Sequence, residues 1–349
     1  MKKFVLLLVF YTHPNNQKLN LNSTPGNSFC GRITGSKLRM VFSMVLFCAW
    51  TVGSAQQTPV LSQYMFNNMF YNPAYAGNGG GICVNGLFRE QWIGFKDNQG
   101  NKMAPESMFL TVDAPIRKLH GGVGGSVMLD KIGYFENISV NLGYAFRADL
   151  GAGTFAAGAQ LQLDNIKLDF SKFKDHVIDE NDPVLAEEAD QSDLLADFAL
   201  GLYYEVQDKY YIGISAAQIA QTKGKNTYYQ HRRTYTLTGG YNFILPNYPL
   251  WEIKPTAIIQ YDQGAFQWNL SGILTYKKKF WGGLGYRFQD AAIILAGLNI
   301  KNFRVGMSYD ISTSALTNYN SGSVEVMIGY CFKMELEKYR KRYRNTRFL

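Results

Sequence analysis

The residues that could perform acid–base or nucleophilic chemistry are few, and the predicted strands keep them apart. Beyond the N-terminal leader the histidines are His120, His176 and His231, and each falls in a predicted turn or loop. Two lie at one end of the predicted strands and one lies at the other, so they cannot share a serine or a carboxylate as nucleophilic catalysis requires. We therefore expect no catalytic residue and no enzymatic activity.

Metal or cofactor binding is not favoured either. The acidic loop Ile166–Ala196 lacks the Asp-x-Asp-x-Asp-Gly spacing with a distal Glu that marks an EF-hand, so we interpret it as a solvated surface loop. The glycines of Gly121–Gly125 are not followed by Lys-Ser/Thr, and we interpret them as relieving crowding within a strand. We expect no metal and no cofactor. The loop carboxylates are Asp175, Asp179, Glu180, Asp182, Glu187, Glu188, Asp190 and Asp193.

The positive charge of the chain is concentrated in its first 55 residues. That region contains six basic residues and no Asp or Glu, so its removal lowers the formal net charge from +8 to +2. Nucleic-acid binding usually needs a basic face on the folded domain. We therefore expect no nucleic-acid partner.

A secretory signal precedes the rest of the chain. A basic stretch, Lys37–Met40, is followed by the apolar run Val41–Val52 and by small residues ending at Ala55. This order is typical of a signal peptide, so we predict that residues 1–55 are a leader cleaved after Ala55. Met40 could be the true start. A lipoprotein through Cys48 is disfavoured because the preceding Phe47 is too bulky.

From Ile82 onward the chain alternates between apolar and polar residues in segments of about ten residues, long enough to cross a bilayer as tilted strands. On one segment Phe266, Trp268 and Leu270 share a face opposite Asn269 and other polar residues. No apolar run of the mature chain reaches the roughly 18 residues of a membrane-spanning helix. The fourteen predicted strands are near Ile82–Trp92, Pro105–Ala114, Gly122–Asp130, Phe135–Asp149, Thr154–Asn165, Asp197–Val206, Tyr210–Ala217, Arg233–Leu245, Trp251–Asp262, Ala265–Tyr276, Phe280–Phe288, Ala291–Asn299, Asn302–Ile311 and Gly322–Phe332.

We predict an all-β fold, a transmembrane antiparallel outer-membrane β-barrel over residues 82–332 that contacts membrane lipid. A soluble β-sandwich also alternates, but aromatic residues at the segment ends favour interfaces with a membrane. With a periplasmic N-terminus the four longest links, Ile93–Ala104, Ile166–Ala196, Gln218–Arg232 and Ser312–Ser321, all face outside, as barrels prefer. We interpret the lumen charges as a structural lining, with contact to a plug or a threaded chain as the alternative. These charges are Arg89, Arg147, Arg287, Arg304, Asp149 and Asp310.

Between leader and barrel, Leu61–Gly77 reads LSQYMFNNMFYNPAYAG and has neither a strand nor a helix period. We predict that residues 56–81 form an ordered periplasmic extension that braces or plugs the barrel. Two parts of it, Leu61–Tyr64 and Tyr71–Gly77, resemble the opening signature of the PorP/SprF family. The resemblance in layout extends from about Leu61 to about Phe332.

That family consists of outer-membrane proteins of the type IX secretion and gliding machinery of Bacteroidetes. The resemblance implies a non-enzymatic component that supports export or surface attachment of proteins with C-terminal sorting domains, including gliding adhesins. It implies contacts with those secreted proteins, with the periplasmic ring lipoprotein and with peptidoglycan-linked components. We expect both termini in the periplasm and the long loops outside. The partner-binding candidates within the motif are Tyr64, Tyr71, Asn72, Pro73 and Tyr75.

The mature chain retains two cysteines and a basic tail. Cys83 and Cys331 fall near the periplasmic ends of the first and last strands, where a disulfide and two separate buried thiols both remain possible. The tail, residues 333–349, has seven basic and two acidic residues. It either contacts anionic surfaces without specificity or docks a periplasmic partner through Arg340, Lys341 and Arg342.

A second class of function is compatible with the same barrel. A barrel of fourteen strands could be a diffusion channel or a transporter of small hydrophobic molecules. An open lumen conducts ions, whereas a lumen filled or capped by the extension conducts little. A soluble binding protein is a third possibility.

Overall fold

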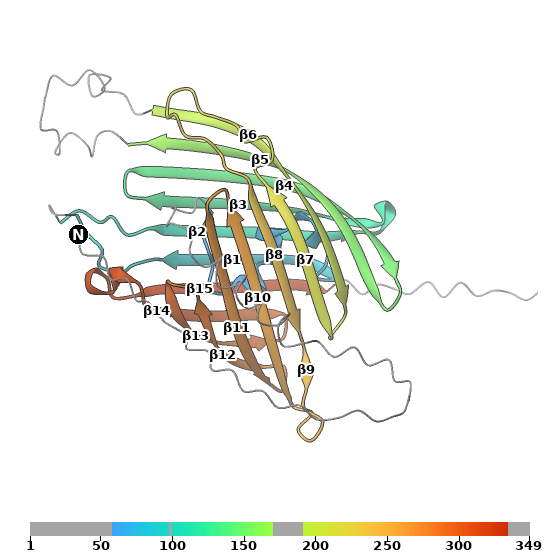
Figure 1. The fold of residues 1–349 in the computed structure, drawn as a ribbon. Coiled ribbons are helices and arrows are strands. Elements are labelled where there is room, and N and C mark those ends of the chain that lie inside the picture. The colour runs from blue at the N-terminus through green and yellow to red at the C-terminus, as the bar shows by residue number, and fades with distance from the viewer. Residues whose placement is uncertain (1–57, 98–99, 170–190, 334–349) are drawn as a thin grey trace, which may run out of the picture. The chain divides into compact units, whose positions relative to one another are not determined.

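The computed structural model describes residues 58–97, 100–169 and 191–333, and they form one closed antiparallel barrel (Figure 1). Among these residues no helix is both long and apolar enough to cross a bilayer. Outside the described residues lie the predicted leader and signal peptide with Met40, the loop residues 170–190 with His176, and the tail residues Arg340, Lys341 and Arg342.

The barrel wall consists of strands that run up and down in sequence order. Two short 3-10 helices, η3 (Arg117–Leu119) and η6 (Ala315–Tyr319), lie in the connections. The strands are β1 (Gly81–Glu90), β2 (Glu106–Ile116), β3 (Gly121–Ile132), β4 (Phe135–Leu150), β5 (Gly153–Leu168), β6 (Gln191–Val206), β7 (Tyr210–Ala217), β8 (Thr234–Tyr241), β9 (Phe243–Ile244), β10 (Trp251–Asp262), β11 (Ala265–Tyr276), β12 (Phe280–Arg287), β13 (Ala291–Ile300), β14 (Phe303–Ser312) and β15 (Ser323–Lys333).

The first and last strands close the ring. β1 pairs with β15, and Cys83 lies opposite Cys331 in this pair. β8 and β9 are two parts of one wall strand, because both pair with β10 and only Asn242 separates them. The closed barrel therefore has fourteen wall strands, the number predicted from the sequence.

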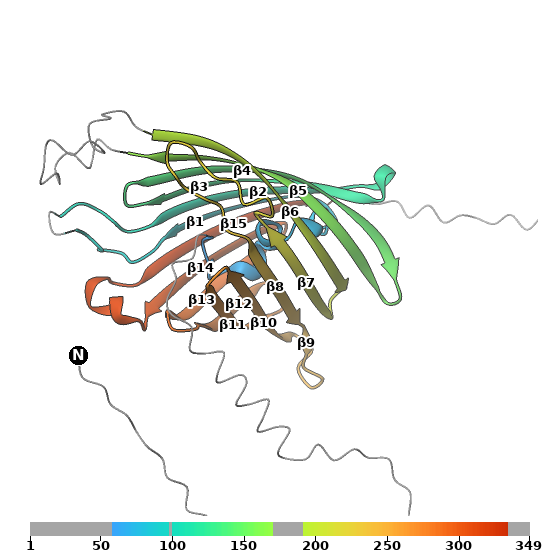
Figure 2. The same cartoon turned by 45° about the horizontal axis from the view of Figure 1, so that its top comes forward.

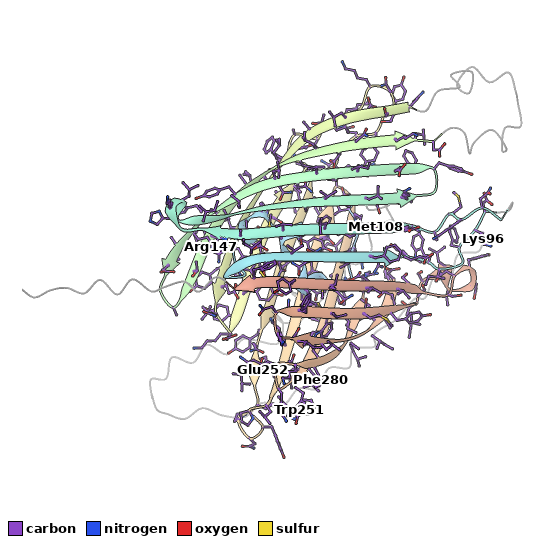
Figure 3. All side chains as sticks on the ribbon, turned by 180° about the vertical axis from the view of Figure 1, so that it is seen from behind. Lys96, Met108, Arg147, Trp251, Glu252 and Phe280 are labelled. Carbon is purple, nitrogen blue, oxygen red and sulfur yellow. A yellow bond between two sulfur atoms is a disulfide. The ribbon has the colours of Figure 1, made fainter. Side chains whose placement is uncertain are left out.

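Alternation along each strand separates an apolar outer face from a polar lumen. On β11 the side chains of Phe266, Leu270 and Leu274 are exposed on the outside, whereas Asn269 and Ser271 are buried inside. Figure 3 shows this outer layer of side chains, with Met108 on β2. Apolar side chains on the outside of such a barrel contact lipid, which makes their exposure favourable.

Aromatic side chains gather at both ends of the wall. At one end Trp251 packs against Tyr276, with ring centroids 4.6 Å apart. At the other end Tyr235 and Tyr261 stack at 6.4 Å. Aromatic belts of this kind mark the two interfaces of an outer-membrane barrel.

The two ends of the barrel differ in their connections. At the short-turn end the strands are joined by turns such as 151–152, 207–209 and 277–279. At the long-loop end the connections include the four longest, 91–105, 169–190, 218–233 and 313–322. The predicted grouping of the longest links at one end is confirmed. Lys96 and Arg147, labelled in Figure 3, mark the long-loop and short-turn ends respectively.

The hairpin of β5 and β6 continues further than predicted. β5 reaches Leu168 and β6 begins at Gln191, whereas the alternating pattern ends near Asn165 and Asp197. Backbone pairing carries on because it needs no apolar side chain, and Ile166 still lies opposite Asp193. The pattern therefore marks the end of the apolar wall and not the end of the strand ladder.

The segment Leu61–Gly77, here called the plug segment, lies inside the barrel as three short helices. These are η1 (Tyr64–Phe66), α2 (Asn68–Tyr71) and η2 (Pro73–Tyr75), drawn in blue within the ring of strands in Figure 2. Their buried residues join lumen-facing wall residues such as Ile258 in the main apolar cluster. The core of the protein is therefore in the lumen, around the plug segment.

The chain passes through the lumen from one end to the other. The Thr58 hydroxyl lies 3.4 Å from that of Thr234, which begins β8 at the long-loop end. Gly77 packs against Gly122 near the short-turn end, shortly before β1 starts. The first described residue, Thr58, and the last, Lys333, therefore lie at opposite ends of the barrel.

Candidate functional site

Asn72 shapes the plug segment and attaches it to the wall. Its Oδ1 accepts a hydrogen bond from the Ala74 N–H at 2.9 Å, an N-cap contact, and Pro73 follows at a position where a helix needs no N–H donor. The Asn72 Nδ2 donates to the carbonyl oxygens of Leu202 at 3.0 Å and Ile214 at 3.2 Å. One side chain therefore sets both the local turn and its place against β6 and β7.

Two tyrosine hydroxyls of the plug segment have partners in the lumen. Tyr64 Oη lies 2.9 Å from Thr256 Oγ1 on β10. Tyr71 Oη accepts a hydrogen bond from the Leu61 N–H at 2.9 Å. A buried tyrosine hydroxyl needs such a partner, so both contacts select this arrangement of the segment.

Wall glycines allow the plug backbone to approach closely. A Cβ added at Gly158 on β5 would overlap the backbone of Pro73 and Ala74, and one at Gly201 on β6 would overlap the side chain of Asn72. Only glycine leaves room for a second backbone at this distance. Gly158 and Gly201 therefore form the seat of the plug segment.

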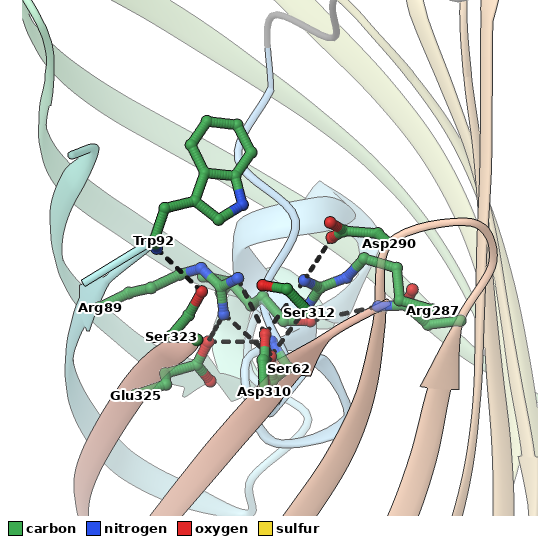
Figure 4. A network of polar contacts seen from close by, with 12 residues as sticks. Ser62, Arg89, Trp92, Arg287, Asp290, Asp310, Ser312, Ser323 and Glu325 are labelled. Atoms are coloured by element: carbon green, nitrogen blue, oxygen red, sulfur yellow. Dashed lines mark hydrogen bonds and ion pairs between the residues drawn. The ribbon is translucent and has the colours of Figure 1, made fainter. Parts of the chain in front are cut away.

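Ser62 lies at the centre of a buried charged network (Figure 4). Its hydroxyl donates to Asp310, with both carboxylate oxygens at 2.7 Å, and accepts from Arg89 Nη1 at 2.9 Å and Arg287 Nη2 at 2.8 Å. All four residues are at most 2% exposed. A serine hydroxyl offers one donor and two lone pairs, and this site uses all of them.

Glu325 on β15 binds the plug backbone and a wall arginine at the same time. Its Oε2 accepts from the Ser62 N–H at 2.9 Å, and its Oε1 accepts from the Gln63 N–H at 2.8 Å. Oε2 also lies 3.1 Å from Arg89 Nη1. The carboxylate thus satisfies the N–H groups of two buried residues that directly precede η1.

Both guanidinium groups of the network are paired with carboxylates. Arg89 pairs with Asp310 at 3.0 Å as well as with Glu325, and Arg287 bridges Asp310 at 3.1 Å and Asp290 at 3.0 Å. Two guanidinium groups therefore face two fully buried carboxylates and the partly exposed Asp290. Removing one partner from a buried ion pair costs about 3–5 kcal/mol, because the other charge is left uncompensated. The network therefore holds the plug segment at one position.

A second buried charged cluster lies at the long-loop end. His231, in the connection 218–233, lies 3.0 Å from Asp164 through Nε2 and 3.2 Å from Asp197 through Nδ1. Burial lowers the pKa of His231, but hydrogen bonds and charge from the two carboxylates outweigh it, so the pKa is raised above its usual 6.5. Within the described residues no group of three or more His, Cys, Asp or Glu could hold a metal ion.

Asp193 has a more specific environment than the solvated loop predicted for it. Its carboxylate accepts hydrogen bonds from the N–H groups of Asn226 at 3.0 Å and Thr227 at 2.7 Å. Asp197 likewise accepts from the Ala220 N–H at 2.8 Å. Two β6 carboxylates therefore hold the connection 218–233, in which His231 is buried.

The structure places the predicted partner-binding residues of the plug segment in the lumen. Tyr64, Tyr71, Asn72 and Pro73 are buried, and Tyr75 packs edge to face on Tyr203 with ring centroids 5.5 Å apart. Their contacts described above are with the barrel wall and with other residues of the plug segment. A role for them in binding another protein stays a prediction.

Cys83 and Cys331 form a disulfide, one of the two states that the sequence left possible. Their Cα atoms are 4.1 Å apart, directly opposite each other in the β1–β15 pair. The bond therefore joins the first and last strands near the short-turn end.

Most of the lumen charges chosen from the sequence contact the plug segment or its network. Arg89, Arg287 and Asp310 surround Ser62 as described. Arg147 donates to the Ala76 carbonyl at 3.4 Å, and Arg304 lies 4.9 Å from the ring centre of Phe66. Asp149 differs, because it is exposed at the end of β4. The alternative interpretation, contact with a plug, therefore describes these charges better than a passive lining.

Sequence reasoning missed Ser62 and Glu325 as a pair. Glu325 carried a signal, because it is a charge on the inward face of the last strand between Val324 and Val326. Ser62 lies within the recognised motif Leu61–Tyr64, but nothing in the sequence indicated its partners, because they come from distant strands. The His231 site was missed for the same reason, because its carboxylates lie on β5 and β6.

The sequence matches a family model described as type IX secretion system membrane protein PorP/SprF over residues 53–330. The chain belongs to the PorP/SprF family. The match covers both the plug segment and nearly all of the wall of this PorP/SprF protein, which confirms the resemblance. A closed barrel with an apolar outer face agrees with an outer-membrane location for a PorP/SprF protein. Among curated proteins no relative matches significantly.

Some solved structures are similar to this PorP/SprF protein at low identity, and similarity at this level carries no argument. The Pseudomonas putida toluene transporter TodX has 11% identity and a TM-score of 0.43, covering 75% of this chain and 93% of its own. The Acinetobacter baumannii outer membrane protein Omp33 has 10% and 0.42, covering 73% and 100%. A Pseudomonas aeruginosa FadL homologue has 11% and 0.41, covering 81% and 96%.

Proposed function

We propose that this protein is a plugged, non-enzymatic component of the type IX machinery that supports export or surface attachment of proteins with C-terminal sorting domains. The observation that carries the proposal is the Ser62–Glu325 network, which holds the plug segment within the lumen. A lumen filled by the chain's own residues favours a scaffold over an open path. Family membership supplies the secretion system in which the scaffold works.

The proposed orientation follows from the two ends of the barrel. Long loops face outside in outer-membrane barrels and short turns face the periplasm. The short-turn end then meets the periplasmic ring lipoprotein and peptidoglycan-linked components. The long-loop end then meets the secreted proteins.

Site-specific photo-crosslinking in cells tests this assignment. A photo-crosslinking residue replaces one of two exposed lysines in separate variants. Lys118 is in the turn before β3 at the short-turn end, and Lys96 is in the connection after β1 at the long-loop end. We expect other type IX components from Lys118 and secreted proteins from Lys96. Leu270, which faces lipid, is the matched control and captures neither. Capture of no type IX component from either end contradicts the proposed function.

Conductance in planar bilayers distinguishes the proposal from the alternative, a diffusion channel or a transporter of small hydrophobic molecules. A lumen that contains the plug segment should conduct little. Steady conductance of the native chain, comparable to that of an open porin, would favour the channel and contradict the plugged scaffold.

A further inference from the structure

A cavity of about 230 Å³ lies at the short-turn end, away from the Ser62 network. The plug segment contributes Met65 and Phe66 to it, and the wall contributes Ile273 and Trp281. Lys278, at its rim, is exposed in the turn between β11 and β12. The cavity therefore opens at the short-turn end of the barrel.

Two aromatic rings form part of the lining of this cavity. The rings of Phe66 and Trp281 pack with centroids 4.7 Å apart, and Gly306 leaves room for the indole, since a Cβ there would approach it to 2.7 Å. Trp281 is 5% exposed, yet its Nε1 has no hydrogen-bond acceptor among the described residues. Buried donors usually have a partner, so this one is available to an acceptor.

Two cations face the same cavity without a carboxylate partner. Lys254 on β10 and Arg304 on β14 are half-buried, and no carboxylate in the described part of the chain is within ion-pair distance of either. Lys254 Nζ lies 5.9 Å from the ring centre of Tyr211, and the Arg304 guanidinium carbon lies 4.9 Å from that of Phe66. Both cations are therefore held against aromatic rings. Arg89 and Arg287 differ, because carboxylates balance them.

Three acidic residues also line the cavity, Glu205, Asp208 and Glu252. Glu252 lies 3.7 Å from Lys278 and accepts a hydrogen bond from Asn242. Glu205 accepts from Asn78, which follows the plug segment. Four basic residues line the cavity against these three, Lys209, Lys254, Lys278 and Arg304, so the lining has a formal charge of +1.

We propose that this cavity binds a carboxylate carried on an aromatic or large apolar group. Lys254 and Arg304 bind the carboxylate with charge-assisted hydrogen bonds, and the apolar group packs on Phe66 and Trp281. The cavity is smaller than the roughly 300–1,000 Å³ of pockets for drug-sized ligands, so it accepts a group about the size of one residue. Such a group is the C-terminal residue of a polypeptide or an acidic side chain beside an aromatic one. The inference does not rest on the secretion role.

Calorimetry on the full chain in detergent micelles tests the proposal. N-acetyl-L-phenylalanine carries the carboxylate, and N-acetyl-L-phenylalaninamide is its neutral match. We expect the acid to bind at least about tenfold more tightly than the amide. An amidated Asp-Phe dipeptide distinguishes a side-chain carboxylate from a C-terminal one, because only its side chain carries a carboxylate. If it binds as tightly as the acid, the ligand is an acidic side chain beside an aromatic one. If it binds more weakly, the ligand is a chain terminus. Equal affinity of acid and amide, or no saturable binding of the acid, overturns the proposal.

Variants identify the cations. Lys254→Gln and Arg304→Gln should each weaken binding of the acid about tenfold and leave binding of the amide unchanged, since only the charged contact is removed. Lys131→Gln is the matched control, because Lys131 is an exposed cation at the long-loop end paired with Glu136. Lys254→Arg keeps the charge and should retain binding. If both Gln variants bind the acid as tightly as the native chain does, Lys254 and Arg304 do not bind the carboxylate. The comparison of acid with amide uses the native chain, so the test of the proposal does not depend on whether a variant folds.

Discussion

The Ser62 N–H donates a 2.9 Å hydrogen bond to the carboxylate of Glu325, across 263 residues of sequence. Ser62 precedes the first strand and Glu325 belongs to the last. Arg89 on β1 contacts both. The same contacts therefore place the plug segment and link the first strand to the last. This is expected of a barrel whose core lies in its lumen.

Glu325→Gln should destabilise the folded barrel by about 3–5 kcal/mol, because Arg89 stays buried with part of its counter-charge removed. Urea unfolding in lipid vesicles, followed by tryptophan fluorescence, measures the change. Glu136→Gln is the matched control, since its pair with Lys131 is exposed, and we expect no measurable change. A similar loss of stability in both variants would show that the Ser62 network is not special.

Gly158→Ala should destabilise the barrel by about 1–3 kcal/mol through overpacking against Pro73 and Ala74. Gly272→Ala, on a wall strand where a Cβ meets nothing within 4 Å, should be neutral. Thermal unfolding of the two variants gives the comparison. If Gly158→Ala unfolds like the native chain, the plug segment does not lie against β5 as described.

The connection 218–233 should become less protected as pH rises. The pKa of His231 is raised in the folded chain, so its contribution to stability is complete below the unfolded value of about 6.5 and is lost as pH rises through the folded value. Hydrogen exchange of the His231 amide, corrected for the intrinsic effect of pH, should show faster opening at alkaline pH. His231→Gln should remove this dependence. Protection that does not vary with pH in the native chain contradicts the assignment.

Thr58 should be accessible from the side of the membrane that the long loops face. This differs from the sequence-based expectation that the N-terminus shares a side with the C-terminus, because the chain passes through the lumen before β1. A membrane-impermeant maleimide on intact cells should label Thr58→Cys like Lys96→Cys at the long-loop end. Lys118→Cys at the short-turn end is the comparison and should be labelled only after the outer membrane is permeabilised. If Thr58→Cys is also labelled only after permeabilisation, the chain does not pass through the lumen as described.

Replacing Cys83 and Cys331 together by serine should lower stability by about 2–5 kcal/mol, because the disulfide joins the two strands that close the ring. Unfolding of the native chain with and without reductant measures the effect. The double variant is the control and should not respond to reductant. A native chain that also does not respond would indicate that the thiols are not paired.

The sequence by itself determined the wall of this barrel. Strand residues that face lipid are apolar and those that face the lumen are polar, so the alternation of Phe266 to Tyr276 predicts a wall strand directly. The strand number and the grouping of long connections followed from the same local rule. The motif Leu61–Gly77 was also recognisable, because it fits neither period and its letters match a family signature.

Only the tertiary structure decided what fills the lumen and which charges meet there. Ser62 reaches Glu325, and His231 reaches Asp164 and Asp197, only after distant strands have closed into a ring. Such contacts depend on the register of the strands and on the position of each side chain along the barrel axis. Neither produces a periodic pattern in the sequence. The same holds for Lys254, Arg304 and Trp281, which line one cavity because their side chains lie at the same end of the barrel.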